Sequence, residues 1–232
     1  VALLTTGDEV VAPETPLGHL RPEQIRNSNG PMARAILLGA GAVLTYEAHL
    51  PDEPEATRRA AREALDAADM VVTVGGVSVG DRDHLPATWA AMGLTSRVHG
   101  ASIQPGRPVL VAAGANRLVL GLPGNPVSVL ATCHLFAWPA LLRLSGVADP
   151  GPPFAEARLG AAARGKAERE VFRPAAIGPD HRVAMLPWQG SGDLAHAAAA
   201  HGLVRLPMGQ PPLEAGATVS FLPFLAAPAG RT

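Results

Sequence analysis

A short apolar run that ends in a glycine-rich turn is the feature that most constrains this chain. Residues 70–74 are Met-Val-Val-Thr-Val, and residues 75–83 are Gly-Gly-Val-Ser-Val-Gly-Asp-Arg-Asp. A β-branched apolar run predicts a buried strand, and glycines directly after it let backbone N–H groups converge on an anion. In open α/β sheets ligands bind at the carboxyl ends of the strands. A plain strand-to-helix turn with solvated aspartates is the alternative.

A second turn of the same kind occupies residues 121–128, Gly-Leu-Pro-Gly-Asn-Pro-Val-Ser, after the apolar run 118–120. Asn125 is a good N-cap and Pro126 suits the first position of a helix. The N–H groups of that first turn, together with the helix dipole, favour an anion. A capped helix start without a ligand is the alternative.

Strands and helices alternate up to about residue 147. We predict strands at 1–4, 42–47, 70–74, 108–112 and 118–120, and helices at 29–38, 54–67, 85–92 and 127–144. Asp52 is the predicted N-cap of the helix at 54–67, and Asn27 or Ser28 lies near the cap of the helix at 29–38. Helices between strands imply right-handed crossovers and a mainly parallel sheet. Residues 1–147 are therefore predicted to form an α/β domain.

The pattern changes after residues 149–153, Asp-Pro-Gly-Pro-Pro, which predict a stiff linker. Short β-like segments then lie between turn signals at 170–172, 183–186, 203–206 and 218–221, and only 193–201 has a helical pattern. Residues 148–232 are therefore predicted to form a small β domain, either a barrel or a sandwich.

Composition excludes several classes of partner. The 232 residues carry a formal net charge of −1, which gives no electrostatic case for nucleic acid or an anionic membrane. No uninterrupted apolar run reaches the roughly 18 residues of a membrane span. Cys133 is the single cysteine, so an intrachain disulfide is excluded. We expect a cytoplasmic protein that binds a small molecule, without nucleic acid or membrane.

Five carboxylates follow the predicted strands. Asp8 and Glu9 end the first strand, Asp52 follows the second, and Asp81 and Asp83 follow the third. In a parallel sheet all five gather at one edge with the two glycine-rich turns. Such a cluster could hold Mg²⁺ and position an oxyanion or a leaving group. Helix capping by Asp8 and Asp52 is the alternative.

Six segments together resemble the MoeA family, the molybdopterin molybdenumtransferases related to the gephyrin E domain. They are residues 5–9, 27–29, 51–52, 75–83, 105–108 and 121–128. The resemblance continues at Phe172-Arg173 and at residues 189–194, which are similar to the family's C-terminal β-barrel domain. It implies a MogA-like, three-layer α/β domain with a mainly parallel sheet, followed by a small β-barrel.

The resemblance also implies a reaction. Family members bind adenylyl-molybdopterin and molybdate, release AMP with Mg²⁺, and leave molybdenum on the pterin dithiolene. The implied catalytic residues are Glu9, Asp52, Asp83, Arg173 and Ser191, with Glu9 and Asp83 as metal ligands. The expected ligand-binding residues are Thr6, Gly7, Asp8, Asn29, Gly75, Gly76, Ser78, Gly80, Asp81, Pro105, Gly106, Arg107, Pro123, Gly124, Asn125 and Ser128.

The sequence departs from the family pattern in two respects. Where the family carries Lys-x-x-x-Lys-Pro-Gly-Lys-Pro, this chain has Gly100, Gln104 and Arg107 at the three lysine positions. Arg107 keeps the charge, whereas Gly100 and Gln104 remove two cations from a site for phosphate and molybdate. The family's long N-terminal arm, which takes part in homodimers and lends acidic residues to the partner's site, is not in this sequence. A fragment and a naturally short protein both agree with this difference.

Three functions follow. The first is insertion of molybdate into adenylyl-molybdopterin, in a full-length form that is a homodimer. The second is molybdopterin adenylylation, the activity of the related MogA-type domain, against which the attached β domain argues. The third is a non-catalytic protein that binds a pterin nucleotide, which the two replaced lysines favour.

Overall fold

The computed structural model describes residues 1–77, 84–114 and 116–224. It contains two compact units, each of which is described here by itself. The first unit comprises Val1–Gly100 and Pro108–Asn125, and the second comprises Ala101–Arg107 and Pro126–Thr232. The chain therefore enters the second unit briefly, returns to the first, and then completes the second.

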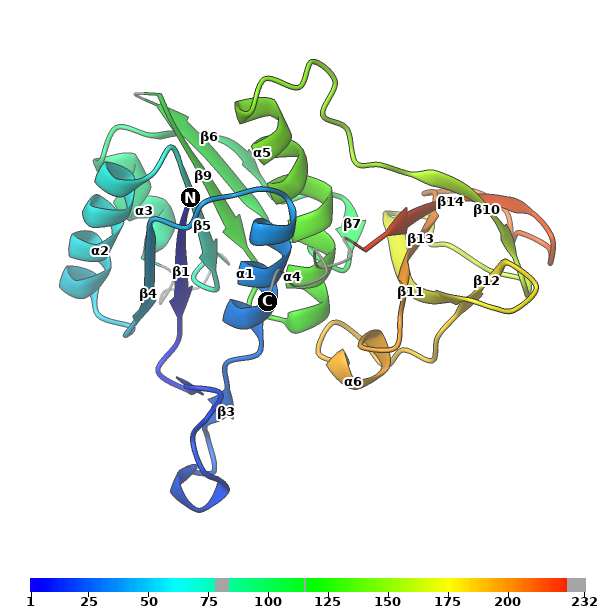
Figure 1. Ribbon diagram of the computed structural model, residues 1–232, viewed down its shortest axis with the longest axis horizontal. Helices are drawn as coiled ribbons and strands as arrows, with labels where there is room; N and C mark the ends of the chain where they lie inside the picture. Colours follow the sequence, from blue (N-terminus) through cyan, green and yellow to red (C-terminus); the bar gives the residue numbers. More distant parts are fainter. Residues whose placement is uncertain (78–83, 115, 225–232) are drawn as a thin grey trace, which may run out of the picture. The chain divides into compact units, whose positions relative to one another are not determined.

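A six-stranded sheet forms the centre of the first unit (Figure 1). Its strands, in spatial order, are β4 (Tyr46–Leu50), β1 (Ala2–Thr6), β5 (Met70–Val74), β9 (Arg117–Leu122), β8 (Leu110–Gly114) and β6 (Thr95–His99). The four strands from β4 to β9 pair in parallel, whereas β8 is antiparallel to both of its neighbours. The prediction of a mainly parallel sheet is confirmed.

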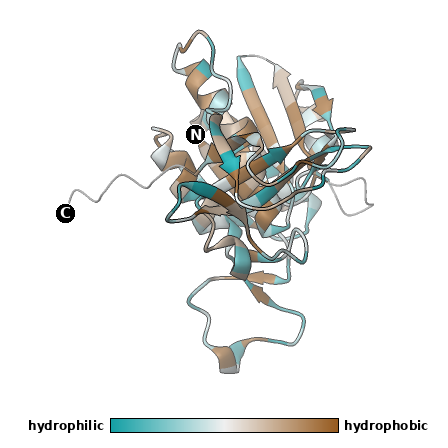
Figure 2. Ribbon diagram, turned by 90° about the vertical axis from the view of Figure 1, so that its right-hand side faces the viewer, coloured by the Kyte–Doolittle hydropathy of each residue, from teal (hydrophilic) through white to brown (hydrophobic). Residues whose placement is uncertain are grey.

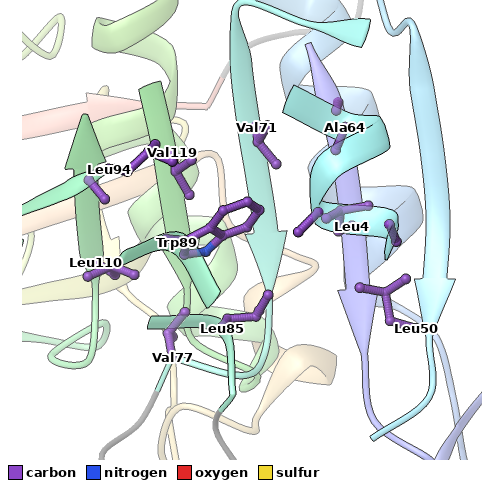
Figure 3. Packing of buried hydrophobic residues seen from close by; sticks show 14 of the residues in the cluster. Leu4, Leu50, Ala64, Val71, Val77, Leu85, Trp89, Leu94, Leu110 and Val119 are labelled. Atoms are coloured by element: carbon purple, nitrogen blue, oxygen red, sulfur yellow. The ribbon is translucent and has the colours of Figure 1, made fainter. Parts of the chain in front are cut away.

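Two helices, α2 (Pro54–Ala67) and α3 (Leu85–Ala91), cover one face of this sheet. Figure 3 shows the packing: Leu4 and Val71 from the strands meet Ala64 of α2 and Trp89 of α3. The buried positions of α2 are threonine and alanine, which let the helix lie close to the strands. Trp89 is only 1% exposed and occupies the centre of the cluster.

The third helix of the unit, α1 (Asn29–Gly39), lies on the opposite face. Side chains alternate along a strand, so Leu3 and Thr5 of β1 point away from the face that carries Leu4. A pocket of about 330 Å³ is lined by Leu3 and Thr5 together with Gly30 and Pro31 of α1. The unit therefore has three layers, as predicted.

An excursion leaves the sheet between β1 and α1. Its strands β2 (Val10–Val11) and β3 (Ile25–Arg26) pair in parallel, and the short 3₁₀ helix η1 (Leu17–His19) lies at its far end. Figure 2 shows hydrophobic colour on this excursion at the bottom of the view. Leu17 is 77% exposed and Ile25 is 58% exposed, so apolar side chains are solvated there.

A closed five-stranded barrel forms most of the second unit. Around the ring the strands are β12 (Arg182–Met185), β10 (Ala155–Leu159), β14 (Thr218–Pro223), β13 (Gly202–Leu206) and β11 (Glu170–Ile177), which pairs again with β12. The short β7 (Ile103–Gln104) pairs in parallel with the first residues of β11 and is not part of the closed ring. The prediction of a C-terminal β-barrel is confirmed, and its core contains Leu159, Val171, Val204 and Phe221.

One long helical stretch completes the second unit. It consists of α4 (Pro126–Thr132), the π-helix η2 (Cys133–Ala137) and α5 (Trp138–Leu144). Ala131 and Leu135 pack against Phe172 and Leu203 of the barrel. By length and composition alone, the stretch Pro126–Leu144 could cross a membrane, and 56% of the window with that hydropathy is buried within the structure. Buried core helices meet the same criteria.

Several predicted boundaries are wrong for identifiable reasons. The strand predicted at 42–47 runs instead from Tyr46 to Leu50, because it is an edge strand whose side chains are buried alternately rather than in an apolar run. The helix predicted at 193–201 contains only Leu194–Ala197. The N–H of His201 donates to the carbonyl of Ala175 at 2.9 Å, so the chain leaves the helix to begin β13 despite its alanine run.

Candidate active site

Asp8 and Glu9 occupy the two central positions of a tight turn at the end of β1. The N–H of Val10 donates to the carbonyl of Gly7 at 3.0 Å and closes this turn. Gly7 has a φ of 123°, a conformation that favours glycine, and a Cβ there would lie 2.7 Å from the Glu9 carboxylate. Both acidic side chains are exposed, so the turn presents two carboxylates to solvent.

The end of β4 supports this acidic turn at two points. His49 Nε2 lies 3.1 Å from the carbonyl oxygen of Gly7. The N–H of Asp52 donates to Asp8 Oδ1 at 3.1 Å. The structure therefore brings together Asp8 and Asp52, two of the five carboxylates that were predicted to gather at this edge.

Asp52 is not the N-cap of α2, and that prediction is wrong. The N-cap is Glu53, whose side chain makes no capping hydrogen bond. Pro54 opens the helix, and a proline forces the residue before it into an extended conformation. Glu53 accordingly has φ −113° and ψ 124°, so the N-cap lies one residue later than predicted, while the helix itself begins at Pro54 as predicted. The Asp52 carboxylate is exposed and is left for another role.

The two glycine-rich turns lie side by side at the same end of the sheet. Gly75 has a φ of 90°, and its N–H donates to the carbonyl of Leu122 at 3.0 Å. A Cβ on Gly124 would lie 4.0 Å from the Cα of Gly75. A Cβ on Gly75 would lie 2.6 Å from Thr6 Oγ1, so only glycine fits beside that hydroxyl. This close packing of bare backbone is what an anion cradle requires.

Asn29 connects the start of α1 to the second glycine-rich turn. Its Nδ2 donates to the carbonyl of Gly124. Because that carbonyl can only accept, the other amide atom, Oδ1, is an acceptor. Oδ1 is buried and has no hydrogen-bond partner among the described residues. Asn29 therefore suits a ligand N–H or O–H group, and not a phosphate oxygen.

A small hollow of about 10 Å³ marks where three of the strands end. It is lined by Thr6, Asp52, Gly76 and His84, together with Pro51, Thr57 and Leu85. Predicted site residues from the ends of β1, β4 and β5 thus meet at one place. His84 and Thr57 were not predicted, because neither lies in a motif.

Part of the predicted site lies outside the described residues. Ser78, Gly80, Asp81 and Asp83 belong to this part. Within residues 1–77, 84–114 and 116–224, no three or more histidine, cysteine or acidic side chains form a group that could hold a metal. Carboxylate oxygens are nevertheless the donors that Mg²⁺ prefers, and Glu9 supplies them at the edge where the glycine-rich turns meet.

In the second unit, the segment 104–107 forms a compact loop. Pro105 and Gly106 are buried. Gly106 has a φ of 106°, and a Cβ there would lie 2.6 Å from the methyl carbon of Thr132. Arg107 is exposed and lines a pocket of about 200 Å³ together with Ser102, Ile103, Glu168 and Arg169. Two guanidinium groups and a hydroxyl therefore share this pocket with one carboxylate.

Arg173, on β11, lies over the indole of Trp188, with its Cζ 5.2 Å from the ring centroid. Its Nη2 donates to the carbonyl of Leu186 at 3.3 Å. Arg173 Nε and Trp188 Nε1 are buried donors without a partner in the described part of the chain. Burial lowers the pKa of the Arg173 guanidinium. Two unpaired donors beside a partly desolvated cation form a place that suits an oxyanion.

Ser191 belongs to a loop that contacts the first turn of α4 within the second unit. Its carbonyl accepts the N–H of Val127 at 2.9 Å, so that helix N–H is already engaged. Ser128 is only 3% exposed. Asp193 holds the loop by accepting the N–H of Gln189 at 2.9 Å, and this bond, followed by that from the His196 ring, lowers the pKa of the Asp193 carboxyl.

Comparison with known protein families gives two matches along the chain. The family described as probable molybdopterin binding domain matches residues 2–143. The family described as MoeA C-terminal region (domain IV) matches residues 156–224. These segments flank the boundary predicted near residue 147, which itself stays a prediction.

Curated relatives match over nearly the whole chain. The molybdopterin molybdenumtransferase of Nostoc sp. is 32% identical over 233 residues, which cover 96% of this chain and 52% of the relative. The enzyme of the same name from Synechococcus elongatus is 33% identical, covering 94% of this chain and 54% of the relative. The one from Bacillus subtilis is 36% identical over 61% of this chain. The chain thus spans about half the length of the first two relatives.

A solved structure matches both units of the chain. The molybdopterin biosynthesis MoeA protein of Pyrococcus horikoshii superposes with a TM-score of 0.77 at 28% sequence identity. The match covers 96% of this chain and 54% of that protein. Both the α/β unit and the barrel therefore have counterparts in one solved relative.

Proposed function

Because this chain belongs to the family of the probable molybdopterin binding domain and carries a MoeA C-terminal region, we propose that it is a molybdopterin molybdenumtransferase of molybdenum cofactor biosynthesis. In this proposal it inserts molybdate into adenylyl-molybdopterin, and AMP is released in a step that depends on Mg²⁺. Because the relatives are about twice as long, the whole reaction, its substrates and its partners all belong to the proposal.

One observation carries the proposal: bare glycine backbone and a pair of exposed carboxylates lie at the same end of one parallel sheet. The turns at Gly75 and Gly124 adjoin. The acidic turn at Asp8 and Glu9 ends the strand that neighbours β5, and Asp52 is hydrogen-bonded to it. Phosphate needs N–H donors without side chains in the way, whereas a metal bound to phosphate needs carboxylates nearby.

The proposed roles follow from these positions. The backbone N–H groups of Gly76 and Gly124 bind the phosphates, while Gly75, whose N–H donates to the carbonyl of Leu122, leaves room for them because it has no side chain. Asn29 Oδ1 accepts a hydrogen bond from an N–H or O–H group of the substrate. Glu9 and Asp83 hold Mg²⁺, which when bound would stabilise the charge that develops on the phosphate oxygens as AMP leaves. Asp52 positions a proton or a water molecule at the same edge.

The barrel residues are proposed to act on oxyanions. Arg173 Nε and Trp188 Nε1 are two adjacent donors without a partner among the described residues, and a planar guanidinium suits a tetrahedral oxyanion such as molybdate. Ser191 is proposed to add a hydroxyl group, and Arg107 to supply a cation for phosphate. The full-length protein is proposed to be a cytoplasmic homodimer with only small-molecule substrates.

A second candidate function is a non-catalytic protein that binds the pterin nucleotide. Gly100 and Gln104 stand where the resemblance implies lysines, and Gln104 Oε1 is buried without a partner in the described part of the chain. With fewer cations, binding of the transition state would be weakened more than binding of the nucleotide, so the protein would bind the nucleotide without turning it over.

The test is release of AMP from adenylyl-molybdopterin by the complete chain, measured with and without molybdate and with and without Mg²⁺. We expect release that needs both, and a loss of roughly a hundredfold or more in Glu9→Gln, because stabilisation of the charge that develops as AMP leaves is weakened. Glu14→Gln is the matched control, because Glu14 is an exposed carboxylate in the excursion between β1 and α1.

Three outcomes would count against the proposal. Tight nucleotide binding without AMP release would favour the non-catalytic protein. Formation of adenylyl-molybdopterin from molybdopterin and ATP would favour the adenylyltransferase. Equal activities of Glu9→Gln and Glu14→Gln would show that the acidic turn has no part in the reaction.

A further inference from the structure

The carbonyl of Gly7 accepts two hydrogen bonds, and one of them comes from outside its own turn. The N–H of Val10 donates to it at 3.0 Å, which closes the turn that carries Asp8 and Glu9. His49 Nε2 lies 3.1 Å from the same oxygen. The conformation of the acidic turn therefore depends on a side chain of the neighbouring strand.

Two side chains, those of Thr5 and Asn27, hold the His49 ring in place. Thr5 and His49 are register partners in the parallel pair of β1 and β4, and Thr5 Oγ1 lies 2.8 Å from His49 Nδ1. Asn27 Nδ2 donates to Thr5 Oγ1 at 3.4 Å, and Asn27 Oδ1 accepts the N–H of Gly30 at 2.8 Å. The chain of bonds thus runs from the first turn of α1 through β1 to β4.

The chemistry of the partners fixes the direction of these bonds. A carbonyl oxygen can only accept, so in the neutral ring the proton is on His49 Nε2. His49 Nδ1 then accepts the hydroxyl proton of Thr5, whose oxygen in turn accepts from Asn27. The series of bonds therefore runs in one direction, from Asn27 through Thr5 and His49 to the carbonyl oxygen of Gly7.

A second bond from the same stretch of chain acts on the same turn. Asp52, three residues after His49, donates its N–H to Asp8 Oδ1 at 3.1 Å. Residues at the end of β4 thus hold the turn at two points, the carbonyl of Gly7 and the carboxylate of Asp8. Glu9, the other carboxylate, makes no hydrogen bond of its own to this stretch in the described structure, so its position follows from the backbone of the turn.

We propose that His49 is a positioning residue that sets the backbone of the acidic turn and thereby the place of the Glu9 carboxylate. The assignment of a catalytic task to Glu9 rests on the proposed function, whereas the bond from His49 to Gly7 does not. The motif around Asp8 and Glu9 gives no sign of this role, because His49 lies 42 residues away in sequence.

Two substitutions separate the bond to Gly7 from the bond to Thr5. In His49→Gln the amide nitrogen reaches about as far as Nε2, so it can still donate to the Gly7 carbonyl. In His49→Asn the amide reaches only as far as Nδ1, so it can face Thr5 but not Gly7. Both variants are polar, neutral and similar in size, and a general change in stability affects them alike.

Amide hydrogen exchange of the complete chain at Val10 and Asp52 is the first measurement. We expect exchange at Val10 to be roughly three- to tenfold faster in His49→Asn than in His49→Gln or the unsubstituted chain, in line with the loss of one hydrogen bond. AMP release is the second measurement, and we expect kcat to fall by a similar factor in His49→Asn while KM stays the same.

Each result decides the inference. Equal exchange at Val10 in the two variants would overturn it, because the bond to Gly7 would then not hold the turn. Faster exchange in His49→Asn with equal kcat in both variants would overturn the link to Glu9. If the unsubstituted chain released no AMP, the proposed function would fail, while the exchange comparison would still decide whether His49 holds the turn.

Discussion

Asp8 and Asp52 meet through a hydrogen bond in which Asp8 contributes its carboxylate and Asp52 only its backbone N–H, at 3.1 Å. One oxygen of Asp8 is thereby committed to holding the turn, whereas this bond leaves the Asp52 carboxylate unused. The two acids lie side by side but are expected to have different tasks.

Asp8→Asn should therefore be much milder than Asp52→Asn. An asparagine at position 8 keeps an oxygen that can accept the N–H of Asp52, so AMP release should change less than about threefold, whereas loss of an acid–base group typically costs about a hundredfold or more. Steady-state rates for both variants at saturating Mg²⁺ test this. A larger loss in Asp8→Asn would assign the chemistry to Asp8 instead.

Gly75→Ala should destabilise the protein more than Gly41→Ala does. The two glycines have φ values of 90° and 89°, so the conformational penalty is the same. A Cβ at Gly75 would lie 2.6 Å from Thr6 Oγ1, whereas nothing lies within 4 Å of one at Gly41. We expect the free energies of unfolding in urea to differ by roughly 1–3 kcal/mol, the usual cost of overpacking. Equal values would mean that Thr6 moves aside freely.

Arg173→Lys should lower the molybdate-dependent rate although it keeps the charge. Lysine cannot stack a flat guanidinium on Trp188 or present the same fork of donors. Loss of the stacking alone corresponds to about 0.5–2 kcal/mol. Arg205→Lys is the control, since Arg205 makes a similar contact, 5.7 Å from the ring centroid of Phe154, but pairs with Glu170. Similar rates in the two variants would contradict an oxyanion role for Arg173.

Stability should fall as the pH drops below about 6.5, and His134 should account for part of this loss. Burial lowers the pKa of His134 in the folded protein, despite the bond from Nδ1 to the carbonyl of Leu130. The unfolded chain binds a proton near pH 6.5 whereas the folded chain resists it, so the contribution is complete above pH 6.5 and is lost toward the lower, folded pKa.

His134→Phe should flatten this part of the pH profile. Phenylalanine keeps ring contacts with Trp138 and Phe224 but cannot bind a proton. Urea unfolding at pH 5 and pH 8 gives the comparison, and His19→Gln, at an exposed position, is the control. An unchanged difference between the two pH values in His134→Phe would show that other groups cause it.

Cys133 should resist thiol reagents until the protein unfolds. Its side chain is fully buried, and burial raises the pKa of the thiol to about 12. At pH 8 the thiolate fraction is then lower by roughly a thousandfold than that of a free cysteine. Because Cys133 is the single cysteine, the rate at which a disulfide reagent labels the protein is the rate for this thiol alone. Rapid labelling without denaturant would contradict the burial.

The sequence predicts best those elements that have a strong local signal. Met70–Val74 and Pro54–Ala67 agree residue by residue with the structure, because one is a β-branched apolar run and the other begins at a proline. The strands Thr95–His99 and Ala155–Leu159 were missed, because the first has no buried face and the second uses alanines where β-branched residues are usual.

The site shows the same division. That the turns at Gly75 and Gly124 lie together follows from the rule that parallel strands end at one edge. His49 could not be found in this way, since its role depends on Thr5 and Gly7, which only the register of β1 and β4 brings near. The N–H of Val127, expected to be open, is taken by a carbonyl from a loop more than sixty residues away.

Residues 101–107 belong to the second unit although the segments on both sides belong to the first. In that short visit β7 pairs with β11, placing Ile103 beside Glu170 and Gln104 beside Val171. A single recombination point between the matched segments 2–143 and 156–224 would therefore separate β7 from β11 and divide the second unit. Either product would lack one partner of the native β7–β11 pair, so an exchange of the barrel between relatives needs compatible residues at 103–104 as well.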